Sequence, residues 1–130
     1  MKNFLFLLFF VPFVALAGQG PTPGLDAIAV ALGTGDVDAL SKFFGDKVEI
    51  SIGENEEVYA KAQAVEVLRN FFSNAKPKAF DAMHKGQSRE SSDQYCIGKL
   101  EGDAGKYRVY VYYKTTSTNT IIQEMRFDKN

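Results

Sequence analysis

The chain has 130 residues, of which 45% are apolar and 24% are charged. Its 15 Lys and Arg residues against 16 Asp and Glu residues give a net charge of −1. This balance excludes a strongly basic nucleic-acid-binding protein, because no excess of cations is present to neutralise phosphates. The ordinary apolar content excludes a disordered acidic tail. The length corresponds to one small domain.

Residues 1–17 predict a secretory signal peptide. Lys2 supplies the short positive segment, residues 4–14 form an apolar run, and Ala15 and Ala17 are the small residues that signal peptidase requires. We expect cleavage after Ala17 and export to the periplasm or the cell exterior, with no stable membrane anchor afterwards. The alternative is an N-terminal anchor, but the run is shorter than the roughly 20 residues that a membrane crossing needs.

Residues 18–24 predict a linker, because they combine Gly, Gln, Pro and Thr, and a single domain is expected over residues 25–130. A first helix is predicted from apolar residues at helical spacing, which are Leu25, Ile28, Ala29 and Leu32. Asp36 is a suitable N-cap for a second short helix that stops at Gly45. The apolar residues expected in this second helix are Val37, Leu40, Phe43 and Phe44.

The strongest helical pattern covers residues 61–75. Its apolar residues share one face of the predicted helix, and they are Ala64, Val65, Val67, Leu68, Phe71 and Phe72. Pro77 prevents the helix from continuing, so we expect this face to lie on a sheet. Before the helix, alternating residues predict a strand over residues 47–52, a turn, and a second short strand at Val58 and Tyr59.

The rest of the chain predicts strands, over residues 78–87, 93–100, 106–114 and 120–128. The connections between them are short, which favours an antiparallel meander. Gly86 and Gly98 fall inside the strand patterns and indicate bulges or bends of a curved sheet. Because helices and strands are segregated along the chain, we predict the α+β class, with two or three N-terminal helices packed on a curved antiparallel sheet.

Alternation divides the last two predicted strands into two faces. We assign one set to the interior, namely Tyr107, Val109, Val111 and Tyr113 with Ile121, Gln123, Met125 and Phe127. The opposite face then carries Arg108, Tyr110, Tyr112, Ile122, Glu124 and Arg126. Aromatic residues among charges leave two interpretations. Cross-strand pairs can cover an exposed face, or this face is a homodimer contact made by Arg108, Tyr110, Tyr112, Glu124 and Arg126.

His84 is the one histidine of the chain and the one side chain that ordinarily titrates near neutral pH. We expect it on the same strand face as Phe80 and Ala82, where a structural role is commoner than a catalytic one. No second His, and no acidic residue or Cys at ligand spacing, accompanies it, so we expect no metal and no cofactor. Cys96 is the single cysteine, and its neighbours predict a buried thiol without a disulfide.

Several short motifs occur in an order that resembles known proteins, and they are residues 58–64, 71–72, 84–88, 95–100, 107–111 and 122–126. This layout resembles the nuclear-transport-factor-2-like superfamily, whose cone-shaped α+β fold is that of ketosteroid isomerase and the SnoaL-type cyclases. More closely, it resembles a family of small secreted bacterial proteins of unknown function, known mainly from Gram-negative Bacteroidetes. The resemblance implies a fold and a pocket inside the cone, and it implies no particular activity.

Three functions are compatible with these residues. The first is non-catalytic binding of a small molecule or peptide in the cone, with the lining residues Tyr59, Phe72, His84 and Tyr95. The second is a protein-interaction or dimerisation module that uses the aromatic sheet face. The third is a small isomerase- or dehydratase-like enzyme with His84 or Asp81 as the base. The catalytic carboxylate and oxyanion hole of the isomerase branch map onto no motif of this chain, so we assign no catalytic residues.

Overall fold

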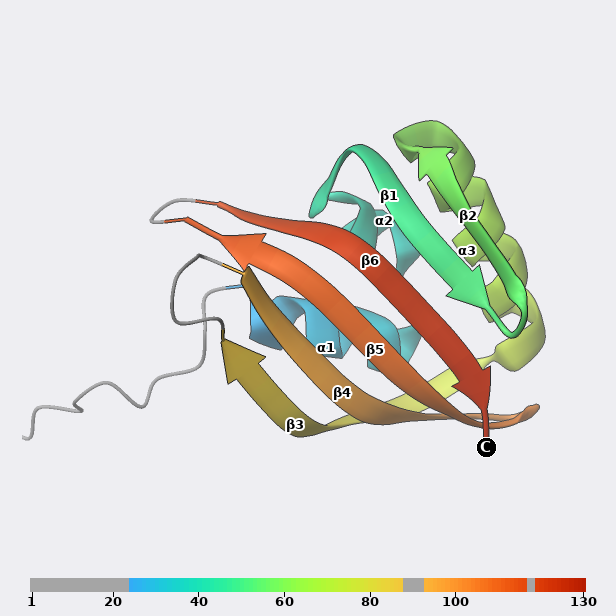
Figure 1. Cartoon of the computed structure of the whole chain (residues 1–130). Helices are drawn as coiled ribbons and strands as arrows, with labels where there is room; N and C mark the ends of the chain where they lie inside the picture. Colours follow the sequence, from blue (N-terminus) through green and yellow to red (C-terminus); the bar gives the residue numbers. More distant parts are fainter. Residues whose placement is uncertain (1–23, 88–92, 117–118) are drawn as a thin grey trace, which may run out of the picture.

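The computed structural model describes residues 24–87, 93–116 and 119–130, which form three helices and six strands (Figure 1). In chain order these are α1 (Leu25–Thr34), α2 (Val37–Ser41), β1 (Phe44–Ile52), β2 (Asn55–Ala60), α3 (Lys61–Ala75), β3 (Pro77–Gln87), β4 (Asp93–Gly102), β5 (Gly105–Thr115) and β6 (Thr120–Lys129). The predicted signal peptide, most of the predicted linker and the loop between β3 and β4 lie outside the described residues. None of the described helices has the length and apolar character needed to cross a membrane.

The six strands form one curved sheet in the order β2-β1-β6-β5-β4-β3. The predicted meander from β3 to β6 is confirmed, with every pair in it antiparallel. One pair differs from the predicted all-antiparallel sheet, because β1 runs parallel to β6. Helix α3 and the meander carry the chain between these two parallel strands, as a parallel pair requires a long connection.

The helices cover one face of the sheet, which we call the inner face (Figure 1). The opposite or outer face of the central strands carries Tyr95, Ile97, Arg108, Tyr110, Tyr112, Glu124 and Arg126. No helix or strand of the described residues covers the outer face. The fold is therefore the predicted α+β cone, with two layers and one uncovered sheet face.

Local signals determine where the helices begin and end. α1 ends at Gly35, which adopts a left-handed conformation at φ 67°. The Asp36 side chain caps α2 and accepts a hydrogen bond from the Ala39 N–H at 3.0 Å. α2 is shorter than predicted and ends at Ser41, because Phe44 instead begins β1, where it pairs with Ile122. α3 has the predicted bounds.

A β-bulge in β6 overturns three of the predicted face assignments. Tyr112 pairs with Glu124, but the next residue of β5, Tyr113, pairs with Ile122, so Gln123 is an extra residue in β6. The extra residue reverses the alternation before it. Ile122 is therefore fully buried on the inner face. Ile121 and Gln123, both predicted to be interior, are exposed instead, Ile121 to 38%.

A second bulge lies in β3 and changes the position of His84. Ala82 pairs with Gly98, and His84 pairs with Ile97, so Met83 is the extra residue. His84 consequently shares the outer face with Ile97, and the prediction that it lies on the face of Ala82 is wrong. Its exposed side chain belongs to the open side of the sheet.

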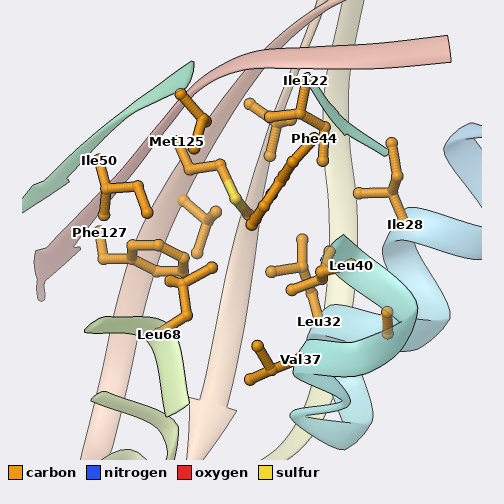
Figure 2. Packing of buried hydrophobic residues seen from close by; sticks show 14 of the residues in the cluster. Ile28, Leu32, Val37, Leu40, Phe44, Ile50, Leu68, Ile122, Met125 and Phe127 are labelled. Carbon is orange, nitrogen blue, oxygen red and sulfur yellow. The ribbon is translucent and has the colours of Figure 1, made fainter. Parts of the chain in front are cut away.

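The core fills the space between the three helices and the sheet (Figure 2). Phe127 of β6 packs beneath α3, with its ring centroid 4.8 Å from that of Phe71 and 5.9 Å from that of Phe72. Leu68 and Met125 pack in the same cluster and are fully buried. Cys96 is buried as predicted, and this burial raises the pKa of its thiol.

Candidate functional site

Three tyrosines on the outer face lie on neighbouring strands. Tyr95 of β4 pairs across the sheet with Tyr112 of β5, and its ring stacks on Tyr110 at a centroid distance of 6.2 Å and an angle of 24°. Gly86, which pairs with Tyr95 on the other side, leaves room for this ring, since a Cβ atom there would overlap it. Tyr95 is 38% exposed, so the strands present an aromatic surface to solvent.

The hydroxyl of one tyrosine, Tyr112, connects this surface to a carboxylate at its edge. The Tyr112 hydroxyl donates a hydrogen bond of 2.6 Å to Asp93 Oδ2, and this bond is the main reason that the pKa of Tyr112 is raised. Tyr95, Tyr110, Tyr112 and Asp93 contribute to a hollow of about 280 Å³, which Gln87 and Gln94 complete. Tyr112 is therefore held in place by a hydrogen bond, whereas Tyr95 and Tyr110 stack on each other.

The neighbouring part of the outer face is acidic and centres on Arg126. Its Nε lies 2.9 Å from Glu124, and its Nη2 lies 3.1 Å from Glu56 of β2. Glu49 of β1 is the direct cross-strand partner of Glu124. Partial burial raises the pKa of Glu49, and the charges of Glu124 and Glu56 raise it further. Two carboxylates thus face each other across the β1–β6 pair, an arrangement that lowers stability.

We expect Glu49→Gln to stabilise the protein at pH 7 by a few tenths of a kcal/mol, because it removes this repulsion at a partly exposed site. The pKa of the Glu49 carboxyl is higher in the folded than in the unfolded protein. Such a group makes the folded protein less stable as the pH rises from the unfolded pKa, near 4.5, through the folded pKa. Urea unfolding from pH 3 to 7 measures the effect. The gain should disappear below the unfolded pKa, and Glu54→Gln in the exposed β1–β2 turn is the control. An equal gain in both variants would contradict the assignment.

The residues predicted to line the cone are not brought together. Phe72 is 5% exposed and belongs to the core, and Tyr59 packs against the edge of that core from β2. His84 and Tyr95 lie on the outer face, on the other side of the sheet. His84 and Asp81 are both exposed on β3, and neither lines the two hollows that the outer-face tyrosines and Arg126 border. Neither residue therefore shares a hollow with these outer-face side chains.

The residues predicted for the interface do lie together. A second hollow, of about 410 Å³, is lined by Ile97, Arg108, Tyr110, Glu124, Arg126 and Asp128. Tyr112 lines the neighbouring hollow, which shares Tyr110 with this one. Glu49 and Glu56 were not predicted from sequence, because they reach this face only through the parallel β1–β6 pair. Tyr95 could have been found by extending the predicted alternation to β4.

A curved sheet with helices on its inner face and an open outer face defines an NTF2-like α+β domain. The chain belongs to the DUF4783 family, described as a domain of unknown function, whose model matches residues 25–128. No match was found among curated proteins.

Solved structures agree with this assignment. A DUF4783 family protein from Bacteroides uniformis is 28% identical, with a TM-score of 0.75 over 82% of this chain and 97% of that one. A second, from Bacteroides fragilis, is 26% identical, with a TM-score of 0.74 over 80% and 96%. An NTF2-like protein of unknown function from Cytophaga hutchinsonii shares 10% identity and the fold, with a TM-score of 0.56 over 80% and 84%.

Proposed function

We propose that this protein is an exported interaction module that binds through the outer face of its sheet, and that its partner is a second copy of the same chain. The export rests on the pattern of residues 1–17. The observation that carries the binding is the surface of Tyr95, Tyr110 and Tyr112 beside Arg108 and Arg126. Tyr and Arg are the residue types enriched in the centres of protein interfaces.

The charges of the outer face support a second copy as the partner. Glu49, Glu56 and Glu124 lie on the side of β2, β1 and β6, whereas Lys99 and Arg108 lie on β4 and β5. A two-fold axis that runs between β5 and β6 would place β6 of one copy opposite β5 of the other, and β1 opposite β4. The strands that carry Glu49 and Glu124 in one copy would then face those that carry Lys99 and Arg108 in the other. A surface with both signs can in this way complement itself, as a symmetric dimer requires.

A small-molecule or peptide ligand inside the cone is the alternative. Such a ligand would have to displace Leu68, Phe72 and Phe127, which are at most 5% exposed. Removing packed side chains from a core costs several kcal/mol. This cost is why we assign the binding function to the outer face instead.

Sedimentation equilibrium of the purified protein from about 1 to 100 µM, a range in which weak dimers dissociate, tests the proposal. We expect twice the mass of one chain at the upper end. The double variant Tyr95→Ser/Tyr110→Ser should raise the dimer dissociation constant at least about tenfold, or about 1.4 kcal/mol. Circular dichroism verifies that the variant is folded.

The matched control is Val30→Ser, since Val30 is 66% exposed on α1, away from the outer face. It should leave dimerisation unchanged. A mass of one chain at every concentration, or equal weakening by the control, would refute the second copy as the partner.

A further inference from the structure

A separate hollow lies away from the outer face, where four segments of the chain meet. It has a volume of about 470 Å³ and lies between the α1–α2 connection, the end of α3, the start of β3 and the β4–β5 turn. Its charged residues are Asp36, Asp38, Arg69, Lys76, Lys78 and Asp103. Its apolar floor is formed by Val37, Phe72 and Pro77.

The carboxylates of this hollow already have partners. Asp36 accepts from the Ala39 N–H at 3.0 Å, and Asp38 lies 3.0 Å from Arg69 Nη2. Asp103 lies 2.6 Å from Lys78 Nζ. Each of these carboxylates therefore already has one partner within the protein.

The hydroxyl groups are used as well. The Thr34 hydroxyl donates to the Val30 carbonyl at 2.9 Å. The Ser73 hydroxyl donates to the Asn70 carbonyl at 2.8 Å. Neither hydroxyl proton is left for a ligand, so what the hollow can still offer is cationic.

Lys76 is the cation with spare capacity. Its ammonium makes no ion pair within 4.0 Å among residues 24–87, 93–116 and 119–130, although its charge, after the hydrogen bond and the charge of Lys78, helps to lower the pKa of Asp103. Arg69 uses only Nη2 for its bond to Asp38, so its other N–H groups are available to a second acceptor. Two cationic residues therefore line a hollow whose carboxylates each have a partner already.

The backbone at Lys76 adds an independent reason to assign a role to its side chain. Lys76 follows the end of α3 with φ 51°, and it is the one non-glycine residue with positive φ in the described part of the chain. Glycine is the usual residue at such a helix end, because a side chain in this conformation costs about 1–2 kcal/mol. Lys76 adopts this conformation in spite of its conformational cost. Strained residues often lie at functional sites, so this conformation points to a function of the Lys76 ammonium.

We propose that this hollow binds a small organic monoanion, a carboxylate with a short apolar group, through Lys76 and Arg69. The apolar group lies on the floor of Val37, Phe72 and Pro77. A monoanion fits better than a phosphate dianion, because Asp36, Asp38 and Asp103 repel each additional negative charge. The site is independent of the proposed dimer contact, since it shares no residue with the outer face.

NMR titration of the purified protein with butyrate at constant ionic strength tests this site. We expect saturable shifts of the Gly35, Ser73 and Lys76 amide signals with a dissociation constant of about 1–10 mM, typical of a small ligand held by a few contacts. Lys76→Asn removes the ammonium and keeps a residue that tolerates positive φ. It should weaken binding at least about threefold, a loss of roughly 0.7 kcal/mol.

The control variant is Lys47→Asn, which makes the same change at an exposed position of β1 that does not line the hollow. It should bind butyrate like the unmodified protein. Butyramide, the neutral analogue, should cause no saturable shift. Absence of butyrate shifts, equal shifts with butyramide, tighter binding of inorganic phosphate, or unchanged binding by Lys76→Asn would each overturn the proposal.

Discussion

Phe127→Ala is expected to lower the free energy of unfolding by about 3–5 kcal/mol, the range found for buried aromatic residues. Phe127 is 1% exposed and packs against Phe71 and Phe72, so its removal leaves a cavity between α3 and the sheet. A loss of this size is a large part of the total stability of a small domain, about 5–15 kcal/mol. Urea unfolding followed by far-ultraviolet circular dichroism measures the loss.

Phe43→Ala is the control for this variant, because Phe43 is only partly buried at the edge of the same core. Its side chain loses less contact area, so the cost should be clearly smaller. Equal losses of stability in the two variants would contradict the tighter packing of Phe127. An open ligand cavity beside Phe127 would also reduce its effect, since the mutation would then remove fewer contacts.

Ile122→Ala is expected to cost about 2–5 kcal/mol, whereas Ile121→Ala should cost less than about 1 kcal/mol. The two residues are identical and adjacent, but Ile122 is fully buried and Ile121 is 38% exposed. This contrast is produced by the bulge at Gln123, so the pair of variants measures the bulge directly. Thermal unfolding is sufficient, because each kcal/mol shifts the midpoint of a domain of this size by about 4–8 °C.

The reverse order of the two isoleucine variants would restore the simple alternation of β6 and place Ile121 in the core. Glu124 and Arg126 would stay on the outer face, because simple alternation from Ile121 places both of them there as well. The result therefore tests the core contacts of β6 before the bulge. Equal effects of the two variants would contradict the pairing of Tyr113 with Ile122.

The helices could be predicted from sequence because their signals are local. The bounds of α3 follow from apolar residues within a few turns of one another and from Pro77 directly after it. The cap of α2 follows from Asp36 and an N–H three residues away. The aromatic outer face of β5 follows equally from alternation within a single strand.

The misassigned residues all depend on partners that are distant in the chain. Simple alternation gives the wrong face for His84, Ile121, Ile122 and Gln123, because a bulge exists only relative to the neighbouring strand. The sequence pattern predicts Phe44 in a helix, because an apolar residue suits a helix and a strand equally. Its pairing with Ile122 places it in β1 instead. Local patterns carry no information about these pairings.

The sequence by itself therefore determined the α+β class, the long helix and the aromatic strand face, because each depends on residues close together in the chain. Tertiary structure alone decided that side chains fill the cone and that Glu49 lies opposite Glu124. It also brought Lys76 and Arg69 to one hollow with the α1–α2 connection. Each of these contacts joins segments whose distance in space is set by the packing of the whole sheet against the helices, which no local pattern encodes.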